Sequence, residues 1–171
     1  MRFAAVLVWA CLASTVVTCA PPPAVAAPEP ATVKPSTVKP SVEELFNAFG
    51  LFGRWANTCA APATPDNPYV TIKTPTTGLV LEDHDLGPDY TVNRYSVVAA
   101  QKVGPERLSV EVIFQPGAEG EERQTLEFLV RGATRRTMFN RTADGTVRVK
   151  GGIAVAMGTR TQLLRKCETK E

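Results

Sequence analysis

The chain has 171 residues and a formal net charge of +2, and 44% of its residues are hydrophobic and 21% charged. These values are typical of one globular domain and exclude a disordered or fibrous chain. Because His84 is the only histidine, multi-histidine metal sites and the HExxH motif are excluded, and the chain also lacks phosphate-binding, dinucleotide-binding and Gly-x-Ser-x-Gly motifs.

The first 26 residues predict a cleaved secretory signal peptide. Arg2 precedes an apolar run, and an A-x-A pattern predicts cleavage before Ala27. The motif VVTC that ends at Cys19 resembles a bacterial lipobox, so acylation of Cys19 is the alternative route. We expect a bacterial periplasmic or secreted protein with no transmembrane span after processing, or a lipid-anchored protein on the alternative route.

A proline-rich linker, residues 27–40, follows the signal peptide. It includes most of the direct repeat TVKPSTVKPS. Proline at this density favours an extended polyproline II conformation and prevents a packed core. We therefore expect a spacer before the folded domain of residues 41–171.

The domain begins with a short predicted helix. Ser41 and Glu44 have the spacing of a capping box. Apolar residues then recur at helical spacing and form one stripe, made of Val42, Leu45, Phe46 and Phe49. Gly50 is the expected C-terminal stop. Because so short a helix is unstable alone, we expect it to cover one end of the sheet that follows.

Two of the four cysteines, Cys59 and Cys167, remain in the processed domain on either route. An even cysteine count in an exported protein predicts a disulfide, and two isolated cysteines supply too few ligands for zinc. The predicted Cys59–Cys167 bond joins the start of the domain to its end.

From Trp55 onward, apolar residues alternate with polar ones. In RLSVEVIFQ at 107–115, for example, Leu108, Val110 and Val112 share one face, and Glu111 lies on the other. Turn residues separate about nine such candidate strands, with no helical pattern between them. The pattern predicts an all-β, antiparallel up-and-down barrel of about eight strands, because the disulfide brings the first and last strands together and closure removes exposed edges.

Gly53-Arg54-Trp55, which follows the short helix, resembles the opening Gly-x-Trp of lipocalin-like barrels. The resemblance implies that Trp55 packs at the closed end of the barrel beneath an arginine from near the last strand. Arg165 is the expected arginine, with Arg160 as the second choice. The resemblance also implies an interior that holds an apolar ligand. The chain is similar, in addition, to small uncharacterised exported proteins of Gram-negative bacteria.

Acidic residues crowd the segment LEDHDLGPDY at 81–90, which contains Glu82, Asp83, Asp85 and Asp89 around His84. We interpret it as a solvated acidic turn between strands, and a divalent cation on oxygen ligands is the alternative. Together with the excluded motifs, this interpretation predicts no enzymatic activity, no catalytic residue, no cofactor and no metal.

Basic residues concentrate in the last part of the chain. From Arg131 to Lys166 there are nine basic residues and one acidic residue. If these strands are neighbours, the charge gathers on one outer face, which we assign to Arg131, Arg135, Arg136, Arg141, Arg148 and Lys150. Such a face can hold an anionic envelope component, or it can simply keep the protein soluble. Nucleic acid is not an expected partner of an exported protein.

Two functions remain open from the sequence. The first is a non-enzymatic barrel that binds a small apolar or amphipathic ligand inside. The alternative is an inhibitor-like protein or envelope interaction module that uses the basic outer face.

Overall fold

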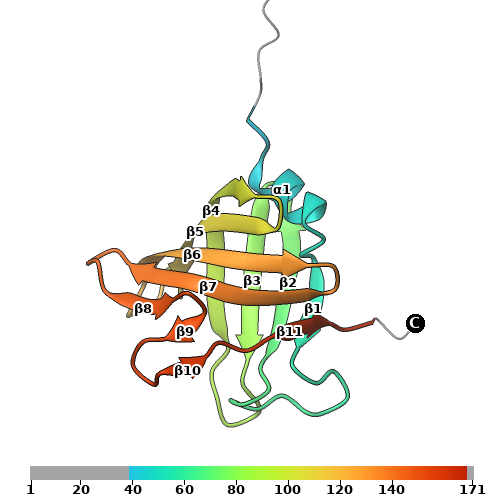
Figure 1. Cartoon of the computed structure of the whole chain (residues 1–171), viewed down its shortest axis with the longest axis vertical. Coiled ribbons are helices and arrows are strands. Elements are labelled where there is room, and N and C mark those ends of the chain that lie inside the picture. The colour runs from blue at the N-terminus through green and yellow to red at the C-terminus, as the bar shows by residue number, and fades with distance from the viewer. Residues whose placement is uncertain (1–38, 169–171) are drawn as a thin grey trace, which may run out of the picture. The chain divides into compact units, whose positions relative to one another are not determined.

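The computed structural model describes residues 39–168. The predicted signal peptide, the alternative acylation site at Cys19 and the linker up to residue 38 lie outside this range. The described residues form a closed antiparallel barrel of eight strands with one short helix, which confirms the predicted fold class (Figure 1). The elements are α1 (Val42–Ala48), β1 (Gly53–Ala56), β2 (Tyr69–Thr76), β3 (Leu79–Asp85), β4 (Asn93–Gly104), β5 (Arg107–Phe114), β6 (Glu122–Arg131), β7 (Thr134–Thr142), β8 (Val147–Lys150), β9 (Ile153–Ala154), β10 (Thr159–Arg160) and β11 (Leu164–Lys166).

The barrel closes because the last strand of the chain pairs with the first. Strands β1 to β7 pair in chain order, and β11 lies between β7 and β1. Trp55 on β1 is opposite Lys166 on β11, and Leu164 on β11 is opposite Arg135 on β7. Each of the eight barrel strands therefore has a neighbour on both sides, which satisfies the backbone groups of the edges.

A small sheet, the β8–β10 extension (residues 147–160), branches from the barrel at β7. The first part of β7 pairs with β11, whereas its last part pairs with β8, where Asn140 is opposite Val149. Strands β9 and β10 continue outward from β8. Figure 1 shows α1 at the top of the barrel and the extension at the lower left. The last short strands before β11 are therefore not barrel strands.

Helix α1 begins and ends as the sequence predicts. The Glu44 amide donates to Ser41 Oγ at 3.2 Å, and the Ser41 amide donates to Glu44 Oε2 at 2.7 Å, so the capping box is confirmed. Gly50, just after the helix, has a φ of 63°. This left-handed conformation favours glycine and stops the helix.

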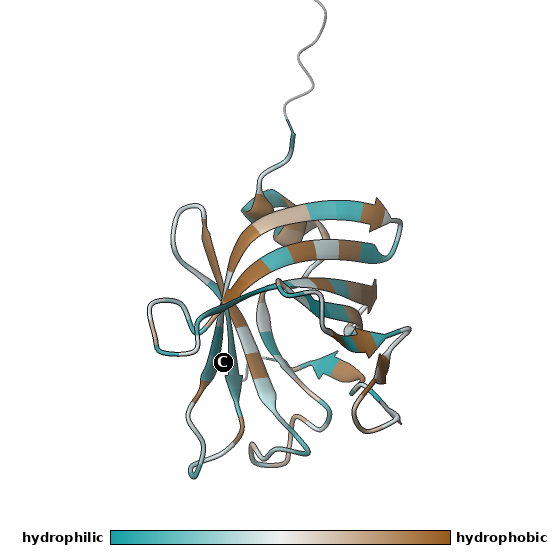
Figure 2. Ribbon diagram, turned by 90° about the vertical axis from the view of Figure 1, so that its left-hand side faces the viewer, coloured by the Kyte–Doolittle hydropathy of each residue, from teal (hydrophilic) through white to brown (hydrophobic). Residues whose placement is uncertain are grey.

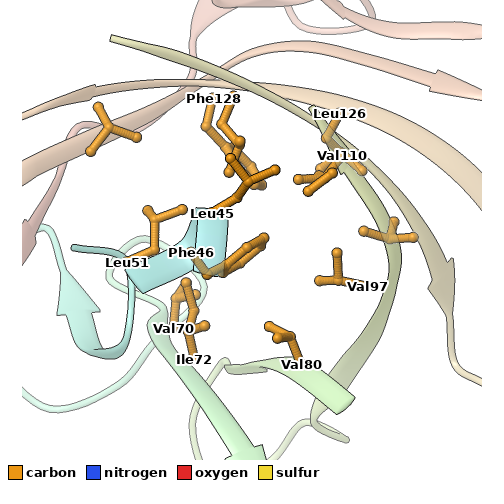
Figure 3. Packing of buried hydrophobic residues seen from close by; sticks show 14 of the residues in the cluster. Leu45, Phe46, Leu51, Val70, Ile72, Val80, Val97, Val110, Leu126 and Phe128 are labelled. Carbon is orange, nitrogen blue, oxygen red and sulfur yellow. The ribbon is translucent and has the colours of Figure 1, made fainter. Parts of the chain in front are cut away.

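The apolar stripe of α1 fills one end of the barrel. Leu45 and Phe46 are buried, and Figure 3 shows Phe46 among the side chains of Val70, Ile72 and Val80 from β2 and β3. Figure 2 shows hydrophobic and hydrophilic positions alternating along the barrel strands. The alternation predicted for 107–115 is confirmed, because Leu108, Val110 and Val112 are buried whereas Glu111 is exposed. The core is thus the barrel interior.

The seam between β1 and β11 holds the predicted disulfide. Cys59 and Cys167 are bonded, with 5.5 Å between their Cα atoms. Next to them, Trp55 is fully buried, and its Nε1 donates to the Leu51 carbonyl oxygen at 2.7 Å. The disulfide therefore fastens the first barrel strand to the last.

The prediction that an arginine packs over Trp55 is wrong. Lys166 Nζ lies 5.6 Å from the centre of the Trp55 ring, whereas Arg165 is exposed and is opposite Ala56. Directly opposed residues share a face of the sheet, so a register that pairs Trp55 with Lys166 turns Arg165 away. Arg160, the second choice, lies on β10 outside the barrel. Gly53 begins β1 with a φ of 111°, and a Cβ there would lie 3.5 Å from Lys166 Cε.

Within residues 39–168, no helix combines the length and the apolar character that crossing a membrane requires.

Candidate functional site

The inner face of the barrel changes from apolar to polar along β3. Val80, Glu82 and His84 are at alternate positions of this strand and therefore share its inner face. On β4, Val97 is opposite Val80 and Tyr95 is opposite Glu82. Helix α1 packs against β3 and β4, where Val80 and Val97 contribute to the core. His84 and Tyr95 lie toward the other end of the barrel, which we call the cavity end.

A buried ion pair crosses the barrel interior. Arg135 Nη2 on β7 donates to Glu82 Oε1 at 2.6 Å, and Nη1 donates to Oε2 at 3.1 Å. The two side chains are only 2% and 6% exposed, and the Arg135 guanidinium stacks over Phe128 at 4.4 Å from the ring centre. This bidentate geometry satisfies both carboxylate oxygens and holds the two strands at a fixed separation.

Two aromatic rings continue this polar cluster toward the cavity end. His84 Nε2 is 2.7 Å from Glu82 Oε1, and the rings of His84 and Tyr95 are 4.9 Å apart. Burial by itself raises the pKa of Glu82, but the Arg135 charge and the His84 contact outweigh it and lower the pKa to about 2. Burial, together with the Glu82 charge, raises the pKa of Tyr95 to about 12. At neutral pH, Glu82 is therefore a carboxylate and Tyr95 a neutral phenol.

A cavity of about 160 Å³ lies beside this cluster, at the cavity end. Its apolar and aromatic walls come from β4, β5 and β6 and from Val149 of the β8–β10 extension, and Thr161 also lines it. The polar groups that reach it include His84, Tyr95 and Asn140. The β8–β10 extension thus helps to enclose the interior of the barrel.

Asn140, one of the residues that line the cavity, carries an unsatisfied acceptor. Its Nδ2 donates to Gln124 Oε1 at 3.0 Å, but its Oδ1 is buried and finds no hydrogen-bond donor among residues 39–168. A buried acceptor without a partner costs about 1 to 3 kcal/mol. A ligand that donates one hydrogen bond would remove this cost.

The chemistry of the cavity suits a neutral molecule. The charges of Glu82 and Arg135 cancel, and both Glu82 oxygens already accept hydrogen bonds. The groups that remain for a ligand are uncharged or aromatic. An apolar body with one donor group matches these walls.

Only the second half of the acidic segment is the solvated turn that we expected, with Asp85 and Asp89 exposed and residues 88–89 in a turn. Residues 79–85 form strand β3, in which Glu82 and Asp83 are buried on opposite faces. Asp83 forms ion pairs with Lys73 at 2.8 Å and with Arg94 at 2.7 Å, and these pairs lower its pKa. Because strand geometry turns the neighbouring carboxylates apart, the alternative cation site is not assembled. Residues 39–168 hold no group of three or more His, Cys, Asp or Glu side chains that could bind a metal ion.

The predicted basic face is broken up by the fold. Arg135 points into the barrel, because it is opposite the buried residues Leu164 and Val130, so its assignment to the surface is wrong. Arg131 pairs with Glu106 at 2.6 Å, and Arg148 pairs with Glu122 at 2.9 Å.

The other members of the predicted face are more available. Arg141 and Lys150 are exposed, and Arg136 lines a surface groove. The charge on the outside of β7 is therefore smaller and more localised than the sequence suggests.

No protein-family model, no curated protein and no solved structure matches this chain at a significant level.

The sequence pattern of β3 is sufficient to place two of the cavity residues on the inner face of the barrel. Glu82 and His84 continue the period-two alternation of Val80, which places them on the inner face. Tyr95 and Asn140 could not be assigned in this way, because register shifts interrupt the alternation of β4 and β7. Long-range pairing decides which of their residues face inward.

Proposed function

We propose that this protein is exported and binds a small, neutral amphipathic molecule inside its barrel. The observation that carries the proposal is the cavity of about 160 Å³, whose lining includes Asn140 with its buried, unpaired acceptor. Its apolar walls would pack against the body of the ligand, and Asn140 Oδ1 would accept its donor.

The size of the cavity limits the ligand to about one ring or a short branched chain. An engineered apolar cavity of about 150 Å³ in another protein takes up benzene. Pockets for drug-sized molecules are larger, about 300 to 1,000 Å³. A long acyl chain therefore does not fit, and phenol is a suitable first probe because it combines an apolar ring with one donor.

Methyl-resolved NMR titration with phenol, and with toluene as the matched molecule without a donor, tests the proposal. Phenol should shift the methyl signals of Val97, Val112 and Leu126 and should bind more tightly than toluene. Val149→Trp should block both molecules, whereas Lys150→Trp, at the next position of β8 and outside the cavity lining, should not. Unchanged interior methyl signals at millimolar phenol would contradict the proposal.

Export is tested separately by the intact mass of the protein recovered from cells. A chain that starts at Ala27 supports a periplasmic or secreted protein. A chain that starts at Cys19 with added acyl mass would instead place the protein on a membrane.

A further inference from the structure

A second concave site lies on the outside of the barrel. The groove has a volume of about 580 Å³ and is formed by outward residues of β6 and β7, by the β8–β10 extension and by the segment before β11. Its apolar surface comes from Leu129, Met138, Ile153 and Leu163. The groove is separate from the interior cavity, because alternate residues of β7 face opposite sides of the sheet.

Three arginines border the groove, and two of them lack an acidic partner. Arg131 is paired with Glu106, but Arg136 and Arg160 form no ion pair with any residue between 39 and 168. Arg136 Nε is buried and likewise has no hydrogen-bond acceptor in this part of the chain. An unpaired guanidinium beside an apolar surface attracts an anion, because desolvation strengthens the charge-assisted hydrogen bond.

The backbone of the extension fixes Arg136 in this position. Gly152 is buried with a φ of 77°, and a Cβ there would lie 3.2 Å from Met138 Sδ and 3.6 Å from Arg136 Cδ. The Gly152 amide donates to the Met138 carbonyl oxygen at 2.9 Å, and Thr161 N donates to the Gly152 carbonyl oxygen at 2.9 Å. Glycine therefore allows the extension to pack directly against the aliphatic part of the Arg136 side chain. This backbone packing fixes the shape of this wall of the groove.

We propose that the groove binds a single-chain anionic amphiphile, with its head on Arg136 and Arg160 and its tail on the apolar residues. A volume of about 580 Å³ lies within the range of small-molecule pockets. A concave groove with one wall formed by the extension can enclose a single molecule. Binding to a flat membrane would instead require a protruding protein surface. The ligand class also differs from that of the interior cavity, which holds no free charge and has no room for an acyl chain.

Calorimetric titration with octanoate, with 1-octanol as the neutral molecule of equal length, tests the proposal. The wild-type protein should bind octanoate at least tenfold more tightly than octanol, since charge-assisted hydrogen bonds are the stronger kind. Arg136→Gln/Arg160→Gln should lose at least tenfold in octanoate affinity and little in octanol affinity. The matched variant Arg141→Gln/Lys150→Gln removes the same charge outside the groove and should change octanoate affinity less than twofold.

Methyl NMR locates the bound octanoate. Signals of Met138 and Ile153 should shift, whereas those of Val97 and Val112 in the interior should not, so the groove and the interior cavity are tested independently. Equal affinity for octanoate and octanol, equal losses in the two double variants, or shifts confined to the interior would each overturn the proposal. Binding to vesicles of anionic phospholipid without binding of octanoate would also overturn it, in favour of a membrane surface.

Discussion

The two ends of the barrel interior are built on opposite principles. At the helix end, Phe46 and Leu51 are fully buried in an apolar core with Val80. At the cavity end, the same strands carry polar side chains, and a cavity of about 160 Å³ remains. Glu82 on β3 is only two residues from Val80, so the change is abrupt.

This difference supports the proposal that the cavity end, rather than the helix end, binds a ligand. A buried ion pair is commonly no more stabilising than well-packed apolar residues of similar volume, because desolvation offsets the attraction. A barrel selected for stability alone would continue the apolar packing of the helix end. Polar groups that are costly to bury, next to open volume, are instead expected at functional sites.

The largest expected effect on stability comes from disrupting the packing at the helix end. Phe46→Ala removes a fully buried ring and should lower the free energy of unfolding by about 3 to 5 kcal/mol. Phenol affinity should stay unchanged, because Phe46 does not line the cavity. Urea denaturation and NMR titration of the same variant measure both quantities. A loss of phenol affinity in the folded variant would show that the two ends are not separate.

A comparable loss is expected when the ion pair is broken. Arg135→Met leaves Glu82 as a buried carboxylate without its main partner, which should cost about 3 to 5 kcal/mol in the free energy of unfolding. Glu82→Leu/Arg135→Met should recover most of that loss, since an apolar pair needs no charge compensation. Denaturant unfolding of the two variants measures the difference. A double variant no more stable than Arg135→Met would show that the ion pair itself holds the barrel together.

Much of the helix end could be predicted from the sequence. The capping box of Ser41 and Glu44 is a local pattern, and the alternation around Val110 follows from strand geometry, so both were confirmed. The disulfide between Cys59 and Cys167 followed from the cysteine count. The capping box and the alternation are local patterns, whereas the disulfide joins residues 108 positions apart and could be derived only because the processed domain has two cysteines and therefore one possible pairing.

The cavity end could not be predicted in the same way. Arg135 and Arg136 are adjacent and chemically identical, and only the pairing of β7 with its neighbours decides which of them faces the interior. Likewise, a shift of one residue in the register of β1 and β11 decides whether Arg165 or Lys166 is the cation near Trp55. Pairings between distant segments determine both choices, and sequence periodicity does not encode them.

A smaller effect, about 3 kcal/mol, is expected from acid. The pKa of Glu82 is about 2 in the folded protein and 4.5 in the unfolded chain, so folding favours the ionised form. Its contribution to stability is complete above the unfolded-state pKa and should be lost as the pH falls from about 5 to about 2. Urea unfolding at several pH values, with Glu82→Leu/Arg135→Met as the reference, isolates this contribution from those of other carboxylates.

Arg135→Met provides a stronger test, because it should reverse the sign of the dependence of stability on pH. Without the arginine, burial, which raises the pKa of Glu82, is opposed only by the His84 contact, and we expect the pKa to lie above its unfolded value. Relative to the double variant, stability should then fall as the pH rises through the folded pKa, rather than as it falls. An acid dependence equal to that of the wild type would show that Arg135 does not control Glu82.

The smallest expected effect compares one orphaned acceptor at each end. Thr74 Oγ1, which lies beside α1, and Asn140 Oδ1, which lies at the cavity, are both buried without a partner among the described residues. Thr74→Val should change the free energy of unfolding by no more than about 1 kcal/mol, in the stabilising direction, because it removes an unsatisfied hydroxyl. Asn140→Leu removes one orphaned oxygen but leaves Gln124 Oε1 without its donor, so one unsatisfied acceptor replaces another, and the lost hydrogen bond should lower the free energy of unfolding by about 1 kcal/mol. The two variants should differ in binding: Asn140→Leu should lower phenol affinity about tenfold and leave toluene affinity unchanged, whereas Thr74→Val should alter neither. Equal phenol affinities in the two variants would mean that the unpaired oxygen of Asn140 is a structural remnant rather than a ligand contact.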